Sequence, residues 1–470
     1  MTTAADNRTV LLINPRATYV NEIAQKCYPP MNLLYLAAAL REHGYRPAVL
    51  DANAFRMTDE AIDAKVRRLR PAVVGLALYS EILRQVRDMT RLVRAARPEA
   101  KIVLGGPHSN AVPRETLEQF TDADYILLGE AEDSLPQLCE AVRTGAEVGG
   151  IPGIVHRRGP EVVEGPPPQL PEINSVPLPA RDLVAEAYRQ RLYYSLMVRE
   201  APVDTLFTSR GCPFHCGFCY NVRHHYRART PAAVVDELVG IRERGIRDIE
   251  ICDDTFTADR RRALAIFDLI IKEKLDVSFR IKSRVDVFTE DLARRAREAG
   301  VYLVAFGMES GSQRMLDAMN KRITVAQCAR ACELARKYGM FSHSSWIVGY
   351  PGETPESAAE TLDFIRANHP STVNIAVLRP YPNTPAYETA RESGDLVGRW
   401  HPDEEAIPWV RLPWAQERKV LETLVRAMMR KVYFTPYYMG QFAGEIVRGA
   451  NLRLARYAAQ ETMKAIGLRR

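Results

Sequence analysis

The chain has 470 residues, of which 46% are hydrophobic, and its 64 basic and 58 acidic side chains give a net charge of +6. This length accommodates two or three domains, and the mild, dispersed positive charge lacks the strongly basic stripe of a nucleic-acid-binding protein. No stretch reaches the roughly 20 apolar residues that span a bilayer, and the first residues lack the apolar core of a secretory signal. We therefore predict a cytoplasmic protein with no transmembrane segment and no nucleic-acid partner.

The first 148 residues are predicted to form a domain in which strands alternate with helices. Five short apolar runs, separated by helical periodicity, are the predicted strands: residues 10–15, 46–52, 72–79, 101–106 and 125–130. This alternation is typical of an α/β fold with a doubly wound parallel sheet, which binds its ligand beyond the carboxyl ends of the strands. Small and polar residues occupy those ends: Tyr79, Ser80, Gly105, Gly106, His108, Gly129 and Glu130.

Residues 149–200 are predicted to be a linker. They contain the runs Gly149-Gly-Ile-Pro-Gly and Gly165-Pro-Pro-Pro, which favour turns and extended backbone over helix. We therefore place a domain boundary in this segment.

Strands and helices alternate again over residues 201–392, which predicts a partial (β/α)6 barrel. The predicted strands are residues 205–209, 247–252, 277–283, 302–307, 342–348 and 373–378. Active sites of parallel barrels lie at the carboxyl ends of the strands. Those ends carry an unusually polar set: a cysteine loop, Asp253-Asp254, Ser283-Arg284 and Glu309.

The last segment, residues 393–470, is predicted to be small and mostly helical. Helices are expected at 415–432 and 440–466, and the second has a basic face. A solvated helix face is the ordinary explanation of such charge, and contact with a hydrophobic substrate or a membrane surface is the alternative. An aromatic cluster either closes a substrate pocket or, more simply, packs the helices: Tyr433, Phe434, Tyr437 and Tyr438.

Three of the eight cysteines lie close together in the run Cys212-Pro-Phe-His-Cys216-Gly-Phe-Cys219. Thiolates are the usual ligands of four-iron clusters, so three of them indicate a cubane whose fourth iron is open to an exchangeable ligand. A structural zinc site with a nearby histidine is the alternative, and the surrounding strand-helix pattern favours the cluster. The other five are most simply small buried hydrophobes of a reduced protein: Cys27, Cys139, Cys252, Cys328 and Cys332.

The spacing Cys-x3-Cys-x2-Cys resembles the signature of the radical SAM superfamily. The resemblance implies a [4Fe-4S] cluster on these three cysteines, whose open iron binds S-adenosylmethionine (SAM) and cleaves it to a 5'-deoxyadenosyl radical. It also implies SAM-binding roles for Phe218 at the adenine, Asp253 and Asp254 at the methionine amino group, Ser283 and Glu309 at the ribose, and Arg284 at the carboxylate. For each of these a helix cap or a salt bridge, such as Arg284 with Asp286, is the alternative.

The N-terminal domain resembles the cobalamin-binding domain that precedes the radical SAM core in one large subfamily. Two runs carry this resemblance: Leu-Gly-Gly-Pro-His-Ser-Asn at 104–110 and Leu-Gly-Glu-Ala-Glu at 128–132. It implies that the seven strand-end residues named above bind cobalamin. Their glycines would let the backbone approach the flat corrin. The sequence has no Asp-x-His-x-x-Gly run, so cobalt would be bound without a histidine ligand. A domain that has lost its ligand, as in the related aminoglycoside deoxygenases, is the alternative.

These features lead to the hypothesis of a cobalamin-dependent radical SAM methyltransferase acting on an unactivated carbon of a secondary metabolite, lipid or tetrapyrrole. The resemblance implies a small-molecule substrate and a flavodoxin or similar electron donor. The alternative enzymes are a radical SAM dehydratase or deoxygenase, and an oxidative cyclase like that of anaerobic bacteriochlorophyll synthesis. A protein that only senses SAM, cobalamin or redox state is the non-enzymatic alternative, and the polar strand ends argue against it.

A deoxygenase would need a general acid near the substrate, because it removes water from its radical intermediate. Four residues just after the cysteines supply candidates, which alternatively line the adenosine pocket: Tyr220, His224, His225 and Tyr226.

Overall fold

The computed structural model describes residues 7–16, 26–195, 197–220 and 225–447. The chain divides into two compact units. Unit 1 comprises residues 1–194 together with 399–407, and unit 2 comprises residues 195–398 and 408–470. Within the described ranges, no helix is long and apolar enough to cross a membrane.

Unit 1 is built on a seven-stranded sheet in the order β3-β1-β4-β5-β6-β7-β8. The first five strands are parallel and confirm the predicted doubly wound fold: β1 (Thr9–Asn14), β3 (Arg46–Asp51), β4 (Val73–Ala77), β5 (Lys101–Gly105) and β6 (Tyr125–Leu127). The chain places β3 on one side of β1 and β4 on the other. The strand order therefore reverses between β1 and β4, and the crevice at their carboxyl ends is where sheets of this type bind ligands.

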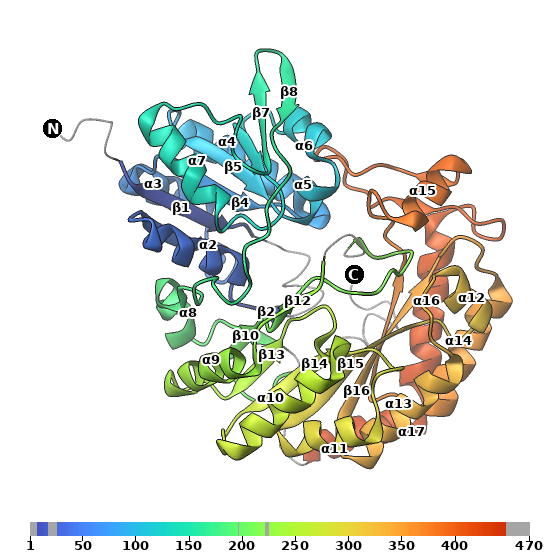
Figure 1. Cartoon of the computed structure of the whole chain (residues 1–470). Helices are drawn as coiled ribbons and strands as arrows, with labels where there is room; N and C mark the ends of the chain where they lie inside the picture. Colours follow the sequence, from blue (N-terminus) through green and yellow to red (C-terminus); the bar gives the residue numbers. More distant parts are fainter. Residues whose placement is uncertain (1–6, 17–25, 196, 221–224, 448–470) are drawn as a thin grey trace. The chain divides into compact units, whose positions relative to one another are not determined.

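Helices cover this sheet (Figure 1): α2 (Met31–Glu42), α3 (Asp59–Leu69), α4 (Leu83–Ala96), α5 (Pro107–Ala111), α6 (Pro113–Gln119) and α7 (Ser134–Thr144). Apolar side chains at helical spacing form the core, where Leu33 of α2 and Leu138 of α7 are buried in one cluster with Leu12 of β1. Thr58 caps α3 by accepting a hydrogen bond from the Ala61 amide. Shorter elements complete the unit: β2 (Lys26–Cys27), η2 (Ser80–Ile82), η3 (Arg181–Val184), α8 (Ala185–Arg189) and β9 (Tyr194–Ser195).

Two strands occupy the segment that we predicted to be only a linker. β7 (Ile154–Arg158) and β8 (Glu161–Glu164) form an antiparallel hairpin that extends the sheet beyond β6. The apolar residues that this hairpin buries, Ile154 and Val155 in β7 and Val162 in β8, make no long run. The glycines and prolines on both sides dominate the sequence pattern and hide these residues. Unit 1 therefore extends to Tyr194, beyond the predicted boundary at 148.

Unit 2 is built on a six-stranded parallel sheet in the order β10-β13-β14-β15-β16-β17, which confirms the predicted partial barrel. The strands are β10 (Val203–Leu206), β13 (Asp248–Ile251), β14 (Ser278–Ser283), β15 (Val301–Glu309), β16 (Phe341–Val348) and β17 (Thr372–Val377). The connecting helices are α9 (Pro231–Glu243), η5 (Phe256–Ala258), α10 (Arg260–Lys272), α11 (Glu290–Glu298), α12 (Gln313–Ala318), α13 (Val325–Lys337) and α14 (Pro355–Asn368). Figure 1 shows α10, α11 and α13 along the outside of the strands.

The end of the described chain contains α15 (Pro385–Glu392), β18 (Leu396–Val397), β19 (Trp409–Val410), α16 (Arg418–Tyr433) and α17 (Pro436–Val447). Tyr433 bonds through its hydroxyl to both the amide and the carbonyl of Val373 in β17, at 2.9 and 2.8 Å. Tyr438 donates to the Pro370 carbonyl at 2.6 Å. These contacts agree with the simpler prediction that the aromatic cluster packs the helices. The basic face predicted within 440–466 lies largely outside the described residues.

Candidate cluster and cofactor sites

The three cysteines of the predicted cluster lie in one loop of unit 2, directly after the first barrel strand. The short strand β11 (Ser209–Arg210) leads into this loop and pairs antiparallel with β12 (Arg227–Ala228). Cys216 is buried, whereas Cys212 and Cys219 are partly exposed. The paired strands close the base of the loop, which presents its thiols at the carboxyl end of the barrel sheet.

Backbone hydrogen bonds hold the cysteine loop to two other segments of unit 2. The Gly217 amide donates to the Met319 carbonyl at 2.8 Å, and the Gly217 carbonyl accepts from the Ala386 amide at 2.9 Å. A Cβ atom at Gly217 would lie 2.5 Å from the Tyr350 hydroxyl oxygen, so a larger residue here would displace the Tyr350 side chain. The conformation of the loop is therefore fixed by its surroundings.

The chemistry of the loop fits a cubane cluster. A [4Fe-4S] cluster distributes its thiolates over different irons, so three separate thiols in one loop match its ligand set. Cys212, Cys216 and Cys219 would hold three irons and leave one open.

Positive charge lies beside the buried thiol. Burial raises the pKa of Cys216, and the charges of Lys321 and Arg284 oppose that rise. Nearby cations favour the thiolate, which is the form that binds iron. The Arg284 guanidinium also stacks on Phe214 of the same loop, with its carbon 3.9 Å from the ring centroid. The two cations are therefore placed to offset the negative charge of a bound cluster.

A buried ion pair joins Glu309, the last residue of β15, to Lys321. The Lys321 Nζ lies 2.9 Å from the Glu309 Oε1, and each side chain is 8% exposed. Burial lowers the pKa of Lys321, but the charges of Glu309 and Cys216, together with the hydrogen bond to Glu309, raise the pKa overall. The Lys321 Nζ also lies 5.5 Å from the centroid of the Phe218 ring. Lys321 thus connects two of the predicted SAM-binding residues.

Glu309 has an unusual backbone conformation, with φ of 67° just after an irregularity in the pairing of β15 with β16. Non-glycine residues rarely adopt this left-handed conformation, and they do so mostly where the surroundings compel it. Here the conformation aims the carboxylate at Lys321 instead of continuing the strand.

Arg284 makes the salt bridge that the sequence analysis named as its alternative role. Its Nε and Nη2 donate to the two carboxylate oxygens of Asp286, each at 3.0 Å, and Nη2 also donates to the Lys321 carbonyl at 2.9 Å. These bonds fix the guanidinium against the cysteine loop. A ligand carboxylate would have to share it with Asp286.

Asp253 is fully buried and bonds to the segment that leads into the cysteine loop. Its carboxylate accepts from the Thr208 amide, the Thr208 hydroxyl and the Ser209 hydroxyl at 2.6, 2.5 and 2.6 Å. A carboxylate with three such donors is satisfied within the protein. Asp253 thus faces the protein chain, and its neighbour Asp254 is the exposed member of the predicted pair.

Ser283 is also engaged with protein partners. Its hydroxyl lies 2.7 Å from that of Thr257 and donates to the Arg284 carbonyl at 3.0 Å. Phe218, Glu309 and Arg284 therefore all lie around Lys321. The side chains of Ser283 and Asp253 instead form hydrogen bonds with other residues of the protein. Lys321 was not predicted, because nothing in a single sequence pairs a loop lysine with a glutamate twelve residues earlier.

The residues predicted as general acids have different surroundings. The Tyr220 ring is 37% exposed and meets Tyr381 edge to face, with ring centroids 6.0 Å apart. His225 is exposed. Tyr226 is half-buried, and burial raises the pKa of its phenol. His224 lies outside the described residues.

Unit 1 has a buried polar cluster where β1 and β3 end. Asp51 accepts hydrogen bonds from the Asn14 amide group at 2.8 Å and the Tyr193 hydroxyl at 2.9 Å, and burial raises the pKa of its carboxyl. Next to it, burial raises the pKa of the Cys27 thiol to about 12, so this thiol stays protonated. Cys27 behaves as the buried hydrophobe that we predicted.

A second polar group lies at the end of β4, on the other side of the point between β1 and β4 where the strand order reverses. The Ser80 hydroxyl is 2.9 Å from His108 Nδ1, and burial lowers the pKa of His108 to about 4, so the ring is neutral at physiological pH. The Tyr79 ring beside them is 41% exposed. An exposed aromatic ring beside the uncharged Ser80–His108 pair fits the face of a flat ligand such as a corrin.

The glycines predicted to admit the corrin are needed for the protein's own packing. Gly106 has φ of 114°, and a Cβ there would lie 3.0 Å from the Leu78 carbonyl oxygen. At Gly129 a Cβ would lie 2.8 Å from Pro168. Gly105 ends β5, and Glu130 is partly exposed in the loop after β6. Close contacts between segments of unit 1 thus also account for glycine at 106 and 129, and the approach of a corrin to these glycines stays a prediction.

Family comparisons agree with this division of the chain. Residues 206–365 match the radical SAM superfamily and residues 18–139 match the B12 binding domain. An "uncharacterized methyltransferase", PH0819, of Pyrococcus horikoshii is 28% identical over 92% of this chain and 92% of its own length. The anaerobic magnesium-protoporphyrin IX monomethyl ester cyclase of Rubrivivax gelatinosus is 28% identical over 79% of this chain and 67% of its own length.

The fold is also that of a solved enzyme. The radical SAM methyltransferase TsrM of Kitasatospora setae, with cobalamin and a [4Fe-4S] cluster bound, superimposes with a TM-score of 0.75 over 92% of this chain and 90% of its own, at 20% identity. Both cofactor regions predicted from the sequence are thus present in the expected order. The chain is a radical SAM enzyme with an N-terminal B12 binding domain, and its cofactors are a [4Fe-4S] cluster, SAM and cobalamin.

Proposed function

We propose that this protein transfers a methyl group to an unactivated carbon of a small molecule, in the class of secondary metabolites, lipids or tetrapyrroles. The observation that carries the proposal is the combination of a radical SAM region with a B12 binding domain in one chain. The relative from Pyrococcus horikoshii, which matches nearly the whole chain, is named a methyltransferase and supports methyl transfer.

The cluster and SAM together supply a radical that abstracts hydrogen, and the corrinoid supplies the methyl group. The protein's part is to hold and shield these groups. Cys212, Cys216 and Cys219 hold the cluster, and the Phe218 ring packs against adenine. Glu309, oriented by Lys321, accepts hydrogen bonds from the ribose hydroxyls.

Asp253 and Asp254 have separate roles in this proposal. The three hydrogen bonds to Asp253 assign it to positioning the cysteine loop, and exposed Asp254 remains as the group for the SAM ammonium. Arg284 provides positive charge near the methionine carboxylate while it stays paired with Asp286. The hydroxyl of Ser283 donates to the Arg284 carbonyl and contacts Thr257, so toward the ribose it would act as an acceptor.

In unit 1, the loops after β4, β5 and β6 bind the corrinoid. Tyr79 offers an apolar ring face, and Gly105, Gly106, Gly129 and Glu130 form the neighbouring backbone. His108 is buried and bonded to Ser80, so we assign it to holding this loop and not to cobalt ligation. A flavodoxin or similar protein supplies electrons in a reducing, cytoplasmic setting, which suits a cysteine-bound cluster.

The test is product analysis under anaerobic conditions with SAM, reductant and supplied cobalamin. We expect S-adenosylhomocysteine, from methylation of the corrinoid, together with 5'-deoxyadenosine from radical formation. The triple variant C212A/C216A/C219A should make no 5'-deoxyadenosine. Formation of 5'-deoxyadenosine without S-adenosylhomocysteine, despite bound cobalamin, would contradict methyl transfer.

An oxidative cyclase is the second candidate function, because the Rubrivivax gelatinosus cyclase matches 79% of this chain. Cyclisation consumes no methyl group, so it would give 5'-deoxyadenosine alone. A deoxygenase would do the same without any corrinoid, and a general acid such as Tyr220, His225 or Tyr226 would then be required. Cobalamin content and S-adenosylhomocysteine together separate the three reactions.

A further inference from the structure

A short loop from late in the sequence belongs to unit 1. Residues 399–407, here called the clasp loop, connect β18 to β19, which pair antiparallel in unit 2. Two ion pairs attach the clasp loop to α4: Arg84 Nη1 lies 2.5 Å from Glu405 Oε1, and Arg87 pairs with Asp403. The Arg87 side chain is only 13% exposed, so this second pair is partly shielded from solvent.

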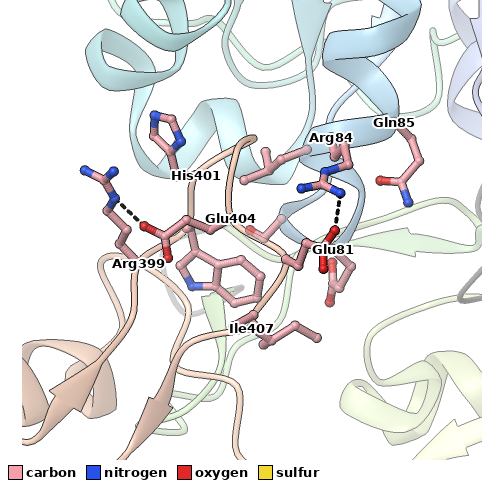
Figure 2. Close-up of a pocket in the computed structure, with 12 residues that line it drawn as sticks. Glu81, Arg84, Gln85, Arg399, His401, Glu404 and Ile407 are labelled. Atoms are coloured by element: carbon pink, nitrogen blue, oxygen red, sulfur yellow. Dashed lines mark hydrogen bonds and ion pairs between the residues drawn. The ribbon is translucent and has the colours of Figure 1, made fainter.

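The clasp loop and the start of α4 enclose a cavity of about 200 Å³. Figure 2 shows Glu81, Arg84 and Gln85 on one side of it and Arg399, His401 and Glu404 on the other. The cavity is smaller than the roughly 300–1,000 Å³ of complete ligand sites. It is large enough for the edge of a bigger ligand.

The cavity lies at the ligand-binding end of the unit 1 sheet. Ser80 lines it and is also the residue that bonds to His108, in the loop directly after β4. Sheets with this strand order bind ligands beyond the carboxyl ends of the strands at the switch point, which here lies between β1 and β4. A ligand lying on the exposed Tyr79 ring would thus extend toward the cavity.

Both arginines of the cavity are paired with carboxylates, which restricts the chemistry of its ligand. Arg84 is matched by Glu405, and Arg399 donates to Glu404 at 2.7 Å. His401 Nδ1 lies 3.2 Å from the Asp403 amide nitrogen and can accept a hydrogen bond from it. The cavity therefore offers donors and acceptors without excess positive charge. A neutral amide needs both a donor and an acceptor, so these groups suit an amide better than a phosphate or a carboxylate.

We propose that the cavity binds carboxamide arms at the periphery of the corrinoid, so that the clasp loop forms part of the cobalamin site. The inference rests on the proposed function, because it assumes that unit 1 holds a corrinoid. It adds a segment outside the B12 binding region of residues 18–139 to the binding site. It also explains why charged residues of α4 hold a loop from late in the chain.

The test is the affinity of the anaerobically purified, cluster-reconstituted protein for hydroxocobalamin, measured by ultrafiltration and absorption. The variant A406F fills the cavity with a ring, and D403N/E405Q breaks both attachments of the clasp loop. Asp63→Asn removes a surface ion pair of α3 away from the cavity and is the control. We expect about tenfold weaker binding for the first two, as for loss of one or two hydrogen bonds, and no change for the control.

A second ligand tests the amide chemistry itself. A cobalamin derivative with a peripheral amide hydrolysed to carboxylate should bind the wild type about tenfold less tightly than cobalamin, for at least one position of the hydrolysed arm. A406F should not make this distinction. Thermal unfolding of each apo variant checks that unit 1 remains folded.

The outcomes separate this inference from the proposed function. If the wild type binds cobalamin and the folded variants bind it equally well, the clasp loop takes no part in the site and the inference is wrong, while the proposed function stands. If the wild type binds no corrinoid at all, both are wrong.

Discussion

Lys321 is the residue on which the candidate SAM site most depends. It neutralises Glu309, contacts the face of Phe218 and bonds through its carbonyl to Arg284. These contacts come from residues far apart in the sequence, so their combination becomes visible only in the fold. The cysteines were predictable because their spacing is local.

Replacing Lys321 with Met should destabilise the protein by about 3–5 kcal/mol, because Glu309 would remain buried without its partner. The double variant E309Q/K321M removes both charges and should recover much of that loss. Denaturant unfolding under anaerobic conditions measures the difference. A double variant as unstable as K321M would show that the charge of Glu309 is not the cause.

Glu353 predicts a pH dependence of stability. Its carboxyl is buried, and burial raises its pKa to about 7. The folded state therefore binds more protons than the unfolded state between the ordinary carboxyl pKa and 7, so stability falls as pH rises through this window. Above pH 7 the loss of folding stability reaches about 3 kcal/mol, because the pKa of Glu353 lies roughly 2.5 above that of an ordinary glutamate carboxyl.

The variant E353Q keeps an acceptor for the Gly349 amide and cannot ionise. We expect it to gain stability relative to the wild type at pH 8 and to lose that advantage at pH 5. Melting temperatures of both proteins at the two pH values measure this, and other groups cancel in the comparison. An advantage independent of pH would contradict the assigned cause.

At the scale of elements, the segment from β10 through the cysteine loop depends on Asp253 at the end of β13. The carboxylate orients Thr208 and Ser209, and Arg262 supports the same turn by donating to the Thr208 carbonyl at 2.6 Å. The position of Asp253 at the end of a strand is predictable from the sequence. The direction in which its side chain points depends on the neighbouring strand, and a single sequence does not specify that.

The variant D253N should retain less iron after reconstitution, because an amide nitrogen cannot accept from the Thr208 and Ser209 hydroxyls and the loop would lose up to two bonds worth about 1–3 kcal/mol each. Its SAM affinity, measured in the fraction that keeps four irons, should stay near that of the wild type. Full iron content with weakened SAM binding would instead assign Asp253 to the SAM ammonium.

Elements with long periodic patterns were predicted well, and those that depend on partners were not. The parallel strands of the unit 1 sheet are largely apolar runs whose burial is evident from their composition. The hairpin β7–β8 is stabilised by its pairing with β6 and is too short to be seen in the sequence pattern. The clasp loop has no regular structure, and its place in unit 1 follows from ion pairs with α4.

For the whole molecule, the arrangement predicts that the clasp loop and the barrel can be separated by mutation. Replacing residues 399–407 with two glycines keeps the strands β18 and β19 and shortens only their connection. Reductive cleavage of SAM to 5'-deoxyadenosine should continue, since the cluster site lies within unit 2. Corrinoid-dependent formation of S-adenosylhomocysteine should fall. Equal loss of both products would mean that the replacement damages the barrel.

The position of the clasp loop also determines the order in which the protein is completed during synthesis. Domains generally fold as units while the chain emerges from the ribosome, the N-terminal ones first. Unit 1 is an exception, because its last segment follows the whole barrel in the sequence. The ribosome must therefore make nearly the entire cluster-binding region before the clasp loop is available to complete unit 1. If the clasp loop forms part of the cobalamin site, a nascent chain would bind cobalamin firmly only after that point.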